Sequence, residues 1–339
     1  NFAITISLSL NRIAKLAVRF FFFACPHRIQ QRTNTKEVEQ MRQAILSCFP
    51  PELRQIFQRI PVSEWERMQE IRLRVGRPIA VHCGQAERFL HVDGTCNDRW
   101  TDAVFLKREQ LDAIFHAACE YSVYRYQREI AEGYVTIQGG NRIGICGTAV
   151  FRDGQYVQMR NISGLNIRLA RQVKDCAKEL AAKLCSQRLT SILLAGTVGS
   201  GKTTMLRDLC RILGQTYRLC IIDSRGELAA VQNSVPQYEI GLHTDVYDGF
   251  PRAEGAVMAL RVMAPDGLVC DEISTAEDAA ALMQVYGCGV QILATAHAAN
   301  EQDLYRRTAL RTLLEAGVFE YLVLLRQGSV QKIQRVAAC

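Results

Sequence analysis

The chain has 339 residues, of which 48% are hydrophobic and 22% charged, and its formal net charge is +7. This length is enough for two domains, and the composition is that of an ordinary globular protein. Residues 1–40 contain six basic and two acidic residues, so +4 of the +7 lies there and +3 in the rest of the chain. A charge of +3 does not by itself indicate a protein that binds nucleic acid.

The cysteine pattern argues against both a zinc site and a disulfide framework. The thirteen cysteines include no C-x-x-C pair, and the six histidines do not cluster near them. Structural zinc sites usually carry such pairs, and an odd count leaves a cysteine without a partner. The pattern predicts a reducing, cytosolic compartment.

We expect residues 1–40 to be a leader that is not part of the native fold. The apolar stretch from Phe2 to Cys25 is interrupted by Arg12, Lys15 and Arg19. It therefore contains no uninterrupted run of about 18 apolar residues that could cross a bilayer. Two interpretations stay open: upstream sequence translated in frame before a true start at Met41, or a basic amphipathic helix on a membrane surface.

Residues 41–175 are expected to form a smaller α+β N-terminal domain. Apolar residues recur at helical spacing in some segments and alternate with polar residues in others. Gly76-Arg77-Pro78 and Gly139-Gly140 mark turns. The expected elements are a helix over 41–59 interrupted at Pro50-Pro51, strands over 70–75 and 79–82, a helix over 107–126, a hairpin of 133–137 with 142–147, and a strand over 165–170.

Two groups of residues in this domain have more than one interpretation. The arginines Arg72, Arg74, Arg77, Arg168 and Arg171 could form a solvated strand face, or could cover phosphates or an acidic partner. Tyr121, Tyr124 and Tyr126 lie near Arg125 and Arg128, which makes them the nearest approach to a base-stacking platform. Core and rim positions are the simpler explanation for these tyrosines.

Residues 176–339 are expected to form the second domain, and its central motif is a phosphate-binding P-loop. An apolar strand over 191–195 precedes the loop, and a helix over 204–213 follows it. Such glycine-rich loops point backbone N–H groups at phosphate oxygens, and the helix N-terminus adds partial positive charge. Lys202 would reach the β- and γ-phosphates, and the Thr203 hydroxyl would bind Mg²⁺. The residues expected to bind nucleotide are Gly196, Thr197, Val198, Gly199, Ser200, Gly201, Lys202, Thr203 and Thr204.

Three further strands of this domain end in polar residues. The strand over 218–222 ends in the acidic segment Asp223 to Glu227, and the strand over 267–270 ends in Asp271-Glu272. The latter is the Walker B form, in which Asp271 would orient Mg²⁺ and Glu272 would polarise the attacking water. The strand over 289–297 ends in Thr295 and His297, where a polar side chain can touch the γ-phosphate.

These strands alternate with helical stretches at 276–286 and 302–316, and a hairpin of 321–325 with 330–333 closes the chain. Alternation of this kind predicts an α/β fold, a mostly parallel sheet with helices on both faces. With the P-loop, this is the RecA/AAA-like architecture of P-loop NTPases.

The order of motifs resembles the ATPases of type II and type IV secretion systems. That family has a P-loop, an acidic box (here Asp223 to Glu227), a Leu-Arg…Pro-Asp stretch (here 260–266), the Walker B strand and a histidine box (here 294–297). From Met41 onward the chain more closely resembles the stage III sporulation protein AA family of endospore-forming Firmicutes. The segments that carry this closer resemblance are 70–74, 133–137, 142–147, 166–168 and 248–255.

The resemblance implies a ring-forming, hexameric ATPase at the cytosolic face of a membrane. It would use ATP and Mg²⁺ and act with an inner-membrane protein of a channel between mother cell and forespore. It assigns the P-loop roles to Lys202 and Thr203, the acidic-box role to Glu227, the Walker B carboxylate to Glu272 and the histidine box to His297. Arginines Arg142, Arg168, Arg171 and Arg261 are candidates to neutralise γ-phosphate charge, from the same or a neighbouring subunit.

Two alternatives to a secretion-type motor remain at this stage. One is a nucleic-acid-associated P-loop ATPase, which the weak charge after residue 40 disfavours. The other is a nucleotide-gated scaffold that hydrolyses ATP slowly and works by assembly.

Overall fold

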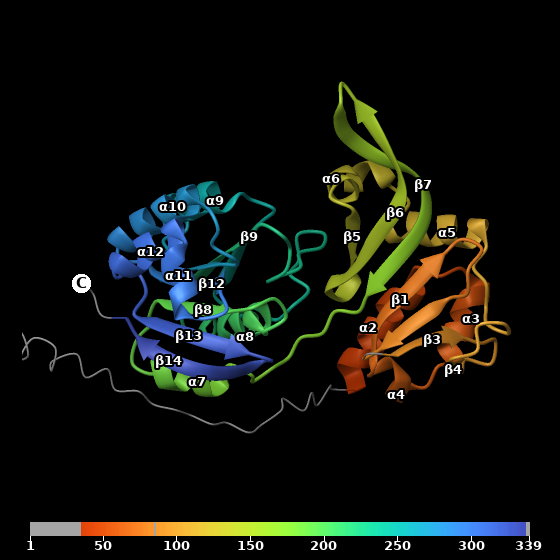
Figure 1. Ribbon diagram of the computed structural model, residues 1–339, viewed down its shortest axis with the longest axis horizontal. Coiled ribbons are helices and arrows are strands. Elements are labelled where there is room, and N and C mark those ends of the chain that lie inside the picture. The colour runs from red at the N-terminus through yellow and green to blue at the C-terminus, as the bar shows by residue number, and fades with distance from the viewer. Residues whose placement is uncertain (1–34, 85, 337–339) are drawn as a thin grey trace, which may run out of the picture.

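The computed structural model describes residues 35–84 and 86–336 of the chain. They form two domains side by side, each built on its own seven-stranded sheet, as Figure 1 shows. Residues 1–34 of the proposed leader lie outside the described residues. Residues 35–40, in contrast, belong to the first helix of the N-terminal domain. Val38 in that helix is buried in the core of the domain, so this helix crosses the boundary that we expected at 40/41.

The N-terminal domain is an antiparallel sheet with helices on one face. The strand order is β4-β3-β2-β1-β7-β6-β5. In β1, Ile71 and Leu73 are fully buried while Arg74 on the other face is exposed, the alternation of a half-covered strand. The elements are α2 (Thr35–Ser47), α3 (Pro51–Arg59), α4 (Val62–Trp65), β1 (Met68–Arg74), β2 (Ala80–Cys83), β3 (Ala86–Leu90), β4 (Cys96–Asn97), α5 (Arg108–Ala118), the 3₁₀ turn η1 (Val123–Tyr126), α6 (Gln127–Ala131), β5 (Tyr134–Ile137), the 3₁₀ turn η2 (Gln138–Gly140), β6 (Asn141–Arg152) and β7 (Gln155–Arg168).

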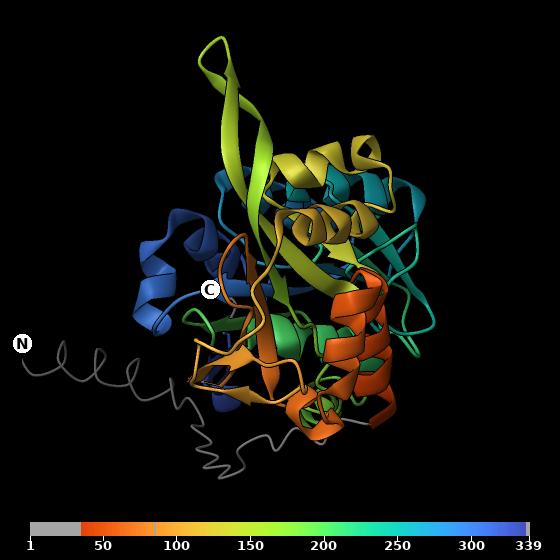
Figure 2. The same ribbon diagram turned by 90° about the vertical axis from the view of Figure 1, so that its right-hand side faces the viewer.

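Strands β6 and β7 extend beyond the sheet as a two-stranded ribbon, which projects away from the body of the molecule (Figure 2). The predicted hairpin of 133–137 with 142–147 exists as β5 and β6, but β6 continues to Arg152 and β7 begins at Gln155. The predicted helix over 107–126 is wrong beyond Ala118, because Glu120 and Tyr121 have positive φ values of 50° and 57°. Helical backbone has negative φ, so α5 ends before these residues.

The second domain, residues 176–339, is called the P-loop domain below. Its strand order is β10-β9-β11-β12-β8-β13-β14, parallel except for β14 at the edge. Its elements are α7 (Lys178–Leu184), β8 (Ile192–Gly196), α8 (Lys202–Leu213), β9 (Leu219–Asp223), β10 (Thr244–Asp248), α9 (Arg252–Val262), β11 (Gly267–Cys270), α10 (Ala276–Gly287), β12 (Gln291–His297), α11 (Glu301–Arg306), α12 (Thr308–Glu315), β13 (Tyr321–Arg326) and β14 (Ser329–Arg335).

Helices cover both faces of this sheet, as the alternation of strands and helices predicts. Successive residues of β8 pack on opposite sides: Leu194 lies in the core with α7 and α8, and Leu193 in the core with α9, α10 and α12. All five residues of β8 are buried, as expected for a central parallel strand. The fold class is therefore the α/β P-loop architecture with a smaller N-terminal domain.

Two elements of the P-loop domain were not predicted from the sequence, and one predicted helix was too long. Edge strand β10 and helix α9 were missed. The helix expected over 302–316 is two helices, because Arg307 between them has an extended backbone with φ −91° and ψ 114°.

Candidate nucleotide-binding site

The P-loop connects the end of β8 to the start of α8. Gly199 and Gly201 have φ values of 73° and 92°, in the region that favours glycine. Gly201 also leaves no room for a side chain, since an added Cβ would lie 3.0 Å from the Cα of Gly328. Helix α8 begins at Lys202 and has twelve residues, so the loop carries the N-terminal backbone groups and dipole of a full helix.

The Lys202 side chain folds across this loop. Its Nζ donates to the carbonyl oxygens of Gly196 at 3.0 Å and Thr197 at 2.9 Å. Burial lowers the pKa of Lys202, while the charges of Asp271 and Glu272 act in the opposite direction. The ammonium group thus lies at the phosphate-binding loop and faces the Walker B carboxylates.

Asp271, the residue after β11, links the P-loop helix to strand β12. The Thr203 hydroxyl donates to Asp271 Oδ2 at 3.0 Å, and the buried Thr295 hydroxyl donates to Asp271 Oδ1. These contacts follow from strand order, because β12 lies between β8 and β11 and all three run parallel. Their carboxyl ends meet at one edge, where open α/β sheets bind ligands.

The backbone of Glu272 is fixed by the neighbouring strand. Its N–H donates to Thr295 Oγ1 at 2.9 Å, and the carbonyl of Asp271 accepts from Arg252 Nε at 2.6 Å. Glu272 itself has φ 47°, uncommon for a residue with a side chain. Its carboxylate forms an ion pair with Arg225, at 2.7 Å between Glu272 Oε2 and Arg225 Nη1.

The acidic box is organised by Asp223, the buried last residue of β9. Its carboxylate accepts the backbone N–H groups of Glu227, Leu228 and Ala229 at 2.8 to 3.0 Å. The Glu227 side chain, in contrast, faces the N-terminal domain, with Oε1 at 3.4 Å from Arg142 Nη1.

His297 ends β12 directly beside the P-loop. It pairs with Gly196 in the parallel ladder, and its Nδ1 lies 3.4 Å from Arg307 Nη2. The histidine box therefore lies at the same sheet edge as the Walker B residues, as its sequence position predicted.

The candidate arginines are in four different settings. Arg142 contacts the acidic box within the same chain, whereas Arg171 donates to the backbone carbonyls of Trp65 and Met68 and so supports the N-terminal domain. Arg168 is exposed, with its Nε 3.9 Å from Glu70 Oε1, and Arg261 lies exposed in the last turn of α9. A role in a neighbouring subunit's site stays a prediction for Arg168 and Arg261.

The remaining basic and aromatic groups lie apart from the P-loop. Arg72, Arg74 and Arg77 line a cavity of about 430 Å³ in the N-terminal domain. Tyr126 is buried, while Tyr121 and Tyr124 are each 81% exposed. Tyr126 thus occupies a core position, whereas Tyr121 and Tyr124 lie on the surface, and both interpretations of these two tyrosines stay predictions.

The donor set at the P-loop fits a nucleotide with Mg²⁺. Thr203 and Asp271 offer hard oxygen atoms, the ligands that Mg²⁺ prefers together with phosphate and water. Among residues 35–84 and 86–336, no group of three or more His, Cys, Asp or Glu side chains could hold a metal ion.

The sequence comparisons assign the family. The model of the family described as "Sporulation stage III, protein AA" matches residues 39–337. The chain belongs to this family. It is 32% identical over 299 residues to stage III sporulation protein AA of Bacillus subtilis (strain 168), covering 85% of this chain and 94% of that protein. The resemblance inferred from the motifs is thereby confirmed.

Solved structures with the same fold are secretion and pilus ATPases. The pilus retraction motor PilT with bound ADP gives a TM-score of 0.52 at 16% identity, covering 78% of this chain and 77% of that chain. The Legionella pneumophila ATPase DotB gives 0.51 at 15% identity, covering 78% and 74%. The sporulation family member thus has the secretion-ATPase fold.

Within the part of the chain that the structure describes, no helix combines the length and apolar character that a bilayer span needs.

The basic residues that hold the site together were not predicted from the sequence. Arg225 lies inside the acidic box, and Arg252 lies inside a segment that carries the family resemblance, but neither was assigned a role. Arg207 of α8 donates to the carbonyl of Glu227 at 2.5 Å and was also missed. Each reaches its partner across the fold, so no spacing in the sequence could have indicated it.

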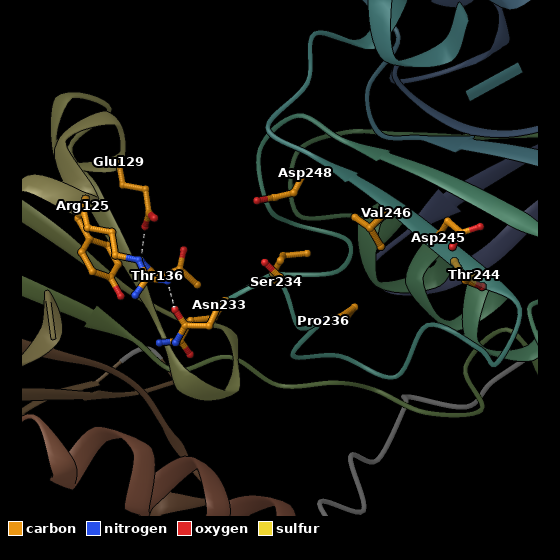
Figure 3. A pocket seen from close by; sticks show the side chains of 13 residues that line it. Arg125, Glu129, Thr136, Asn233, Ser234, Pro236, Thr244, Asp245, Val246 and Asp248 are labelled. Atoms are coloured by element: carbon orange, nitrogen blue, oxygen red, sulfur yellow. Dashed lines mark hydrogen bonds between the residues drawn. The ribbon is translucent and has the colours of Figure 1, made fainter. Parts of the chain in front are cut away.

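A second cavity of about 510 Å³ lies between the two domains, away from the P-loop. Glu129 of α6 and Asp248 of β10 lie on its opposite walls, as Figure 3 shows. Burial raises the pKa of Glu129 and of Asp248, and further carboxylates add to both shifts. This cavity places the half-buried Glu129 and the exposed Asp248 at the domain interface.

Proposed function

We propose that this protein is an ATP-hydrolysing motor subunit of the secretion-ATPase type. The proposal is supported above all by one arrangement, in which Thr203, Asp271, Thr295 and Glu272 are joined at the carboxyl ends of three neighbouring strands beside the P-loop. These groups are the ones that phosphoryl transfer to water needs: phosphate-binding amides, metal ligands and a carboxylate base.

In this proposal the P-loop amides and Lys202 hold the phosphates, and Thr203 with Asp271 holds Mg²⁺. The metal ion, when bound, neutralises charge on the β- and γ-phosphate oxygens. Glu272 accepts a proton from the attacking water, and Thr295 keeps the Glu272 backbone in place. Glu227 and His297 complete the polar edge around the γ-phosphate, and Arg142 is the basic group that the N-terminal domain supplies in the same chain.

We further propose that the working form is a hexameric ring at the cytosolic face of the membrane, acting with an inner-membrane protein of the sporulation channel. Fold similarity to DotB and PilT supports a ring-type motor only by analogy. Family membership supports the sporulation setting.

The test is ATP turnover by the full chain across a range of protein concentrations, with and without single-stranded DNA. The Lys202→Ala variant serves as the blank. We expect turnover above this blank that does not need DNA and that rises per subunit as concentration increases, because assembly would complete the site. Strict dependence on DNA would favour a nucleic-acid-associated ATPase, and no turnover above the blank would contradict the motor.

A further inference from the structure

The side chain of Glu272 is restrained by fewer contacts than its backbone. Its N–H is held by Thr295, and the preceding carbonyl is held by Arg252. The carboxylate, in contrast, is 37% exposed and bonded only to Arg225 among the contacts of the described residues. Where this carboxylate points therefore depends on Arg225.

Arg225 is carried by the acidic-box loop, whose neighbours tie it to both domains. Inside the P-loop domain, Arg207 of helix α8 donates to the Glu227 carbonyl. From the N-terminal domain, Arg142 donates to the backbone carbonyl of Arg225 and lies 3.4 Å from the Glu227 carboxylate. The loop is thus a junction between the P-loop helix, the Walker B carboxylate and the N-terminal domain.

Arg142 is itself held in a defined position. Its guanidinium lies 4.8 Å from the ring centre of Tyr134 on the adjacent strand β5, within cation–π distance. Burial raises the pKa of Tyr134 to about 12, so the ring stays neutral at physiological pH. A rigid sheet therefore carries Arg142, and a displacement of the N-terminal domain would move the Arg225 backbone with it.

We propose that Arg225 is a positioning residue that restrains the carboxylate of Glu272, and that the N-terminal domain controls this restraint through Arg142. The inference rests on the proposed ATPase function and adds its regulation. While Arg225 holds Glu272, the carboxylate cannot turn freely to accept a proton from water. When the N-terminal domain moves, Arg142 shifts the acidic-box loop and releases the pair.

The strength of the ion pair sets the size of the expected effect. The side chains of Arg225 and Glu272 are 59% and 37% exposed, so water and salt weaken their attraction. Exposed pairs typically shift an equilibrium by a factor of about two to five. A restraint of this strength can be broken by a domain movement. Removing the ion pair by substitution should raise ATP turnover by a similar factor.

The first arm of the test is ATP turnover by Arg225→Gln. The matched control is Arg218→Gln, which breaks an ion pair with Asp266 elsewhere in the P-loop domain. That pair has the same 2.7 Å length and similar exposure, 62% and 37%. We expect turnover of Arg225→Gln to rise about two- to fivefold over the parent chain, with Arg218→Gln unchanged. Equal or lower turnover in Arg225→Gln would overturn the proposal, because Arg225 would then assist catalysis or take no part in it.

The second arm does not depend on hydrolysis. Hydrogen exchange of backbone amides 224–229 is followed in Arg225→Gln, Glu272→Gln and Arg142→Gln. Each substitution removes one anchor of the loop, so we expect faster exchange there in all three variants and not in Arg218→Gln. Unchanged exchange in Glu272→Gln would overturn the restraint, since this variant removes only the charge that holds Arg225.

The two arms separate failure of the restraint from failure of the proposed function. If the parent chain turns over ATP above Lys202→Ala but Arg225→Gln does not exceed the parent, the restraint fails and the motor proposal stands. If none of the three hydrolyses ATP, the motor proposal fails, and the exchange measurement alone decides whether the acidic-box loop is anchored as described.

Discussion

Glu272 is the residue on which hydrolysis depends in the proposed mechanism. A Glu272→Gln substitution keeps the size and the backbone contact to Thr295 but removes the group that accepts a proton from water. General-base catalysis contributes about 10²–10⁴-fold. We expect single-turnover hydrolysis to fall by about this factor, while affinity for a fluorescent ATP analogue changes little. An unchanged rate would remove Glu272 from the catalytic role.

Thr295 holds two residues of the site in place, and this structural role can be tested separately from catalysis. It is fully buried, and its hydroxyl donates to Asp271 while accepting the Glu272 N–H. Thr295→Val keeps the shape but leaves both groups without this partner, at a cost of about 1–3 kcal/mol. We expect the melting temperature to fall by about 2–10 °C and turnover to fall with it.

The control for this substitution is Thr295→Ser, which restores the hydroxyl and removes only a methyl group. It should recover most of the lost turnover. Equal loss in the valine and serine variants would show that packing, and not the hydroxyl, is what matters at this position.

At the scale of elements, helices and strands were predicted best where a single spacing of apolar residues continued without interruption. Strand β8 and helix α8 were found within one or two residues, since a fully apolar run and a 3.6-residue pattern flank the P-loop. Strand β10 was missed because this edge strand, Thr-Asp-Val-Tyr-Asp, is only partly buried and carries two acids. Its pairing with β9 is a contact across the fold.

The ribbon of β6 and β7 was missed for a related reason. Its outer part has no core to bury, so its exposed Phe151, Tyr156 and Val157 give no alternation that a buried face would impose. Phe151 and Tyr156 contact each other, with ring centres 6.2 Å apart. The turn at its tip has positive φ at both Asp153 and Gly154, 53° and 77°, as the type I′ hairpin turn requires.

Because the outer ribbon packs mainly on itself, we expect it to be dispensable for folding. Deleting 150–152 and 155–158 would join the paired residues Ala149 and Met159 through the same Asp153-Gly154 turn. Substitutions on such surfaces change stability by about 0.5 kcal/mol or less, so the melting temperature should stay within about 2 °C. Affinity for a fluorescent ATP analogue should also be unchanged.

A matched control for the deletion is Ile162→Ala, further down the same strand β7, where the side chain is 9% exposed and belongs to the domain core. That variant should lose about 2–4 kcal/mol of stability. A comparable loss on trimming the ribbon would show that its outer part supports the N-terminal domain.

At the scale of the whole molecule, strand order explains why the catalytic residues of the site could be predicted from the sequence. The contacts through which the N-terminal domain would regulate the site could not be predicted in this way. Walker B, Thr295 and the P-loop meet because parallel strands end at one edge, and this follows from sequence alone. The Arg142 contacts depend instead on how one domain sits against the other. Nothing in a single sequence gives that orientation, so Arg142 appeared only as one of four candidate arginines.

The domain interface also gives the molecule a predicted pH dependence through Glu129. Burial, together with the charge of Asp248 across the cavity, raises the pKa of Glu129 from its ordinary value of 4.5, while the hydrogen bond from the Thr136 N–H and the Arg142 charge act in the opposite direction. The native protein therefore retains a proton on Glu129 at pH values where the unfolded chain has released it. Stability falls as pH rises above 4.5 through the raised pKa, because the unfolded state then binds fewer protons than the native state.

Glu129→Gln should remove this dependence. The glutamine keeps an oxygen that can accept the Thr136 N–H, as Glu129 Oε2 does at 2.8 Å, but it cannot ionise. We expect the variant to melt at a higher temperature than the parent at pH 7–8, with the difference shrinking towards zero as the pH falls to about 4, where the parent carboxyl is protonated as well. Glu315→Gln, on the exposed end of α12, is the control and should show no such convergence. A constant offset between Glu129→Gln and the parent at every pH would mean that packing in the interdomain cavity, and not the buried charge, accounts for the effect.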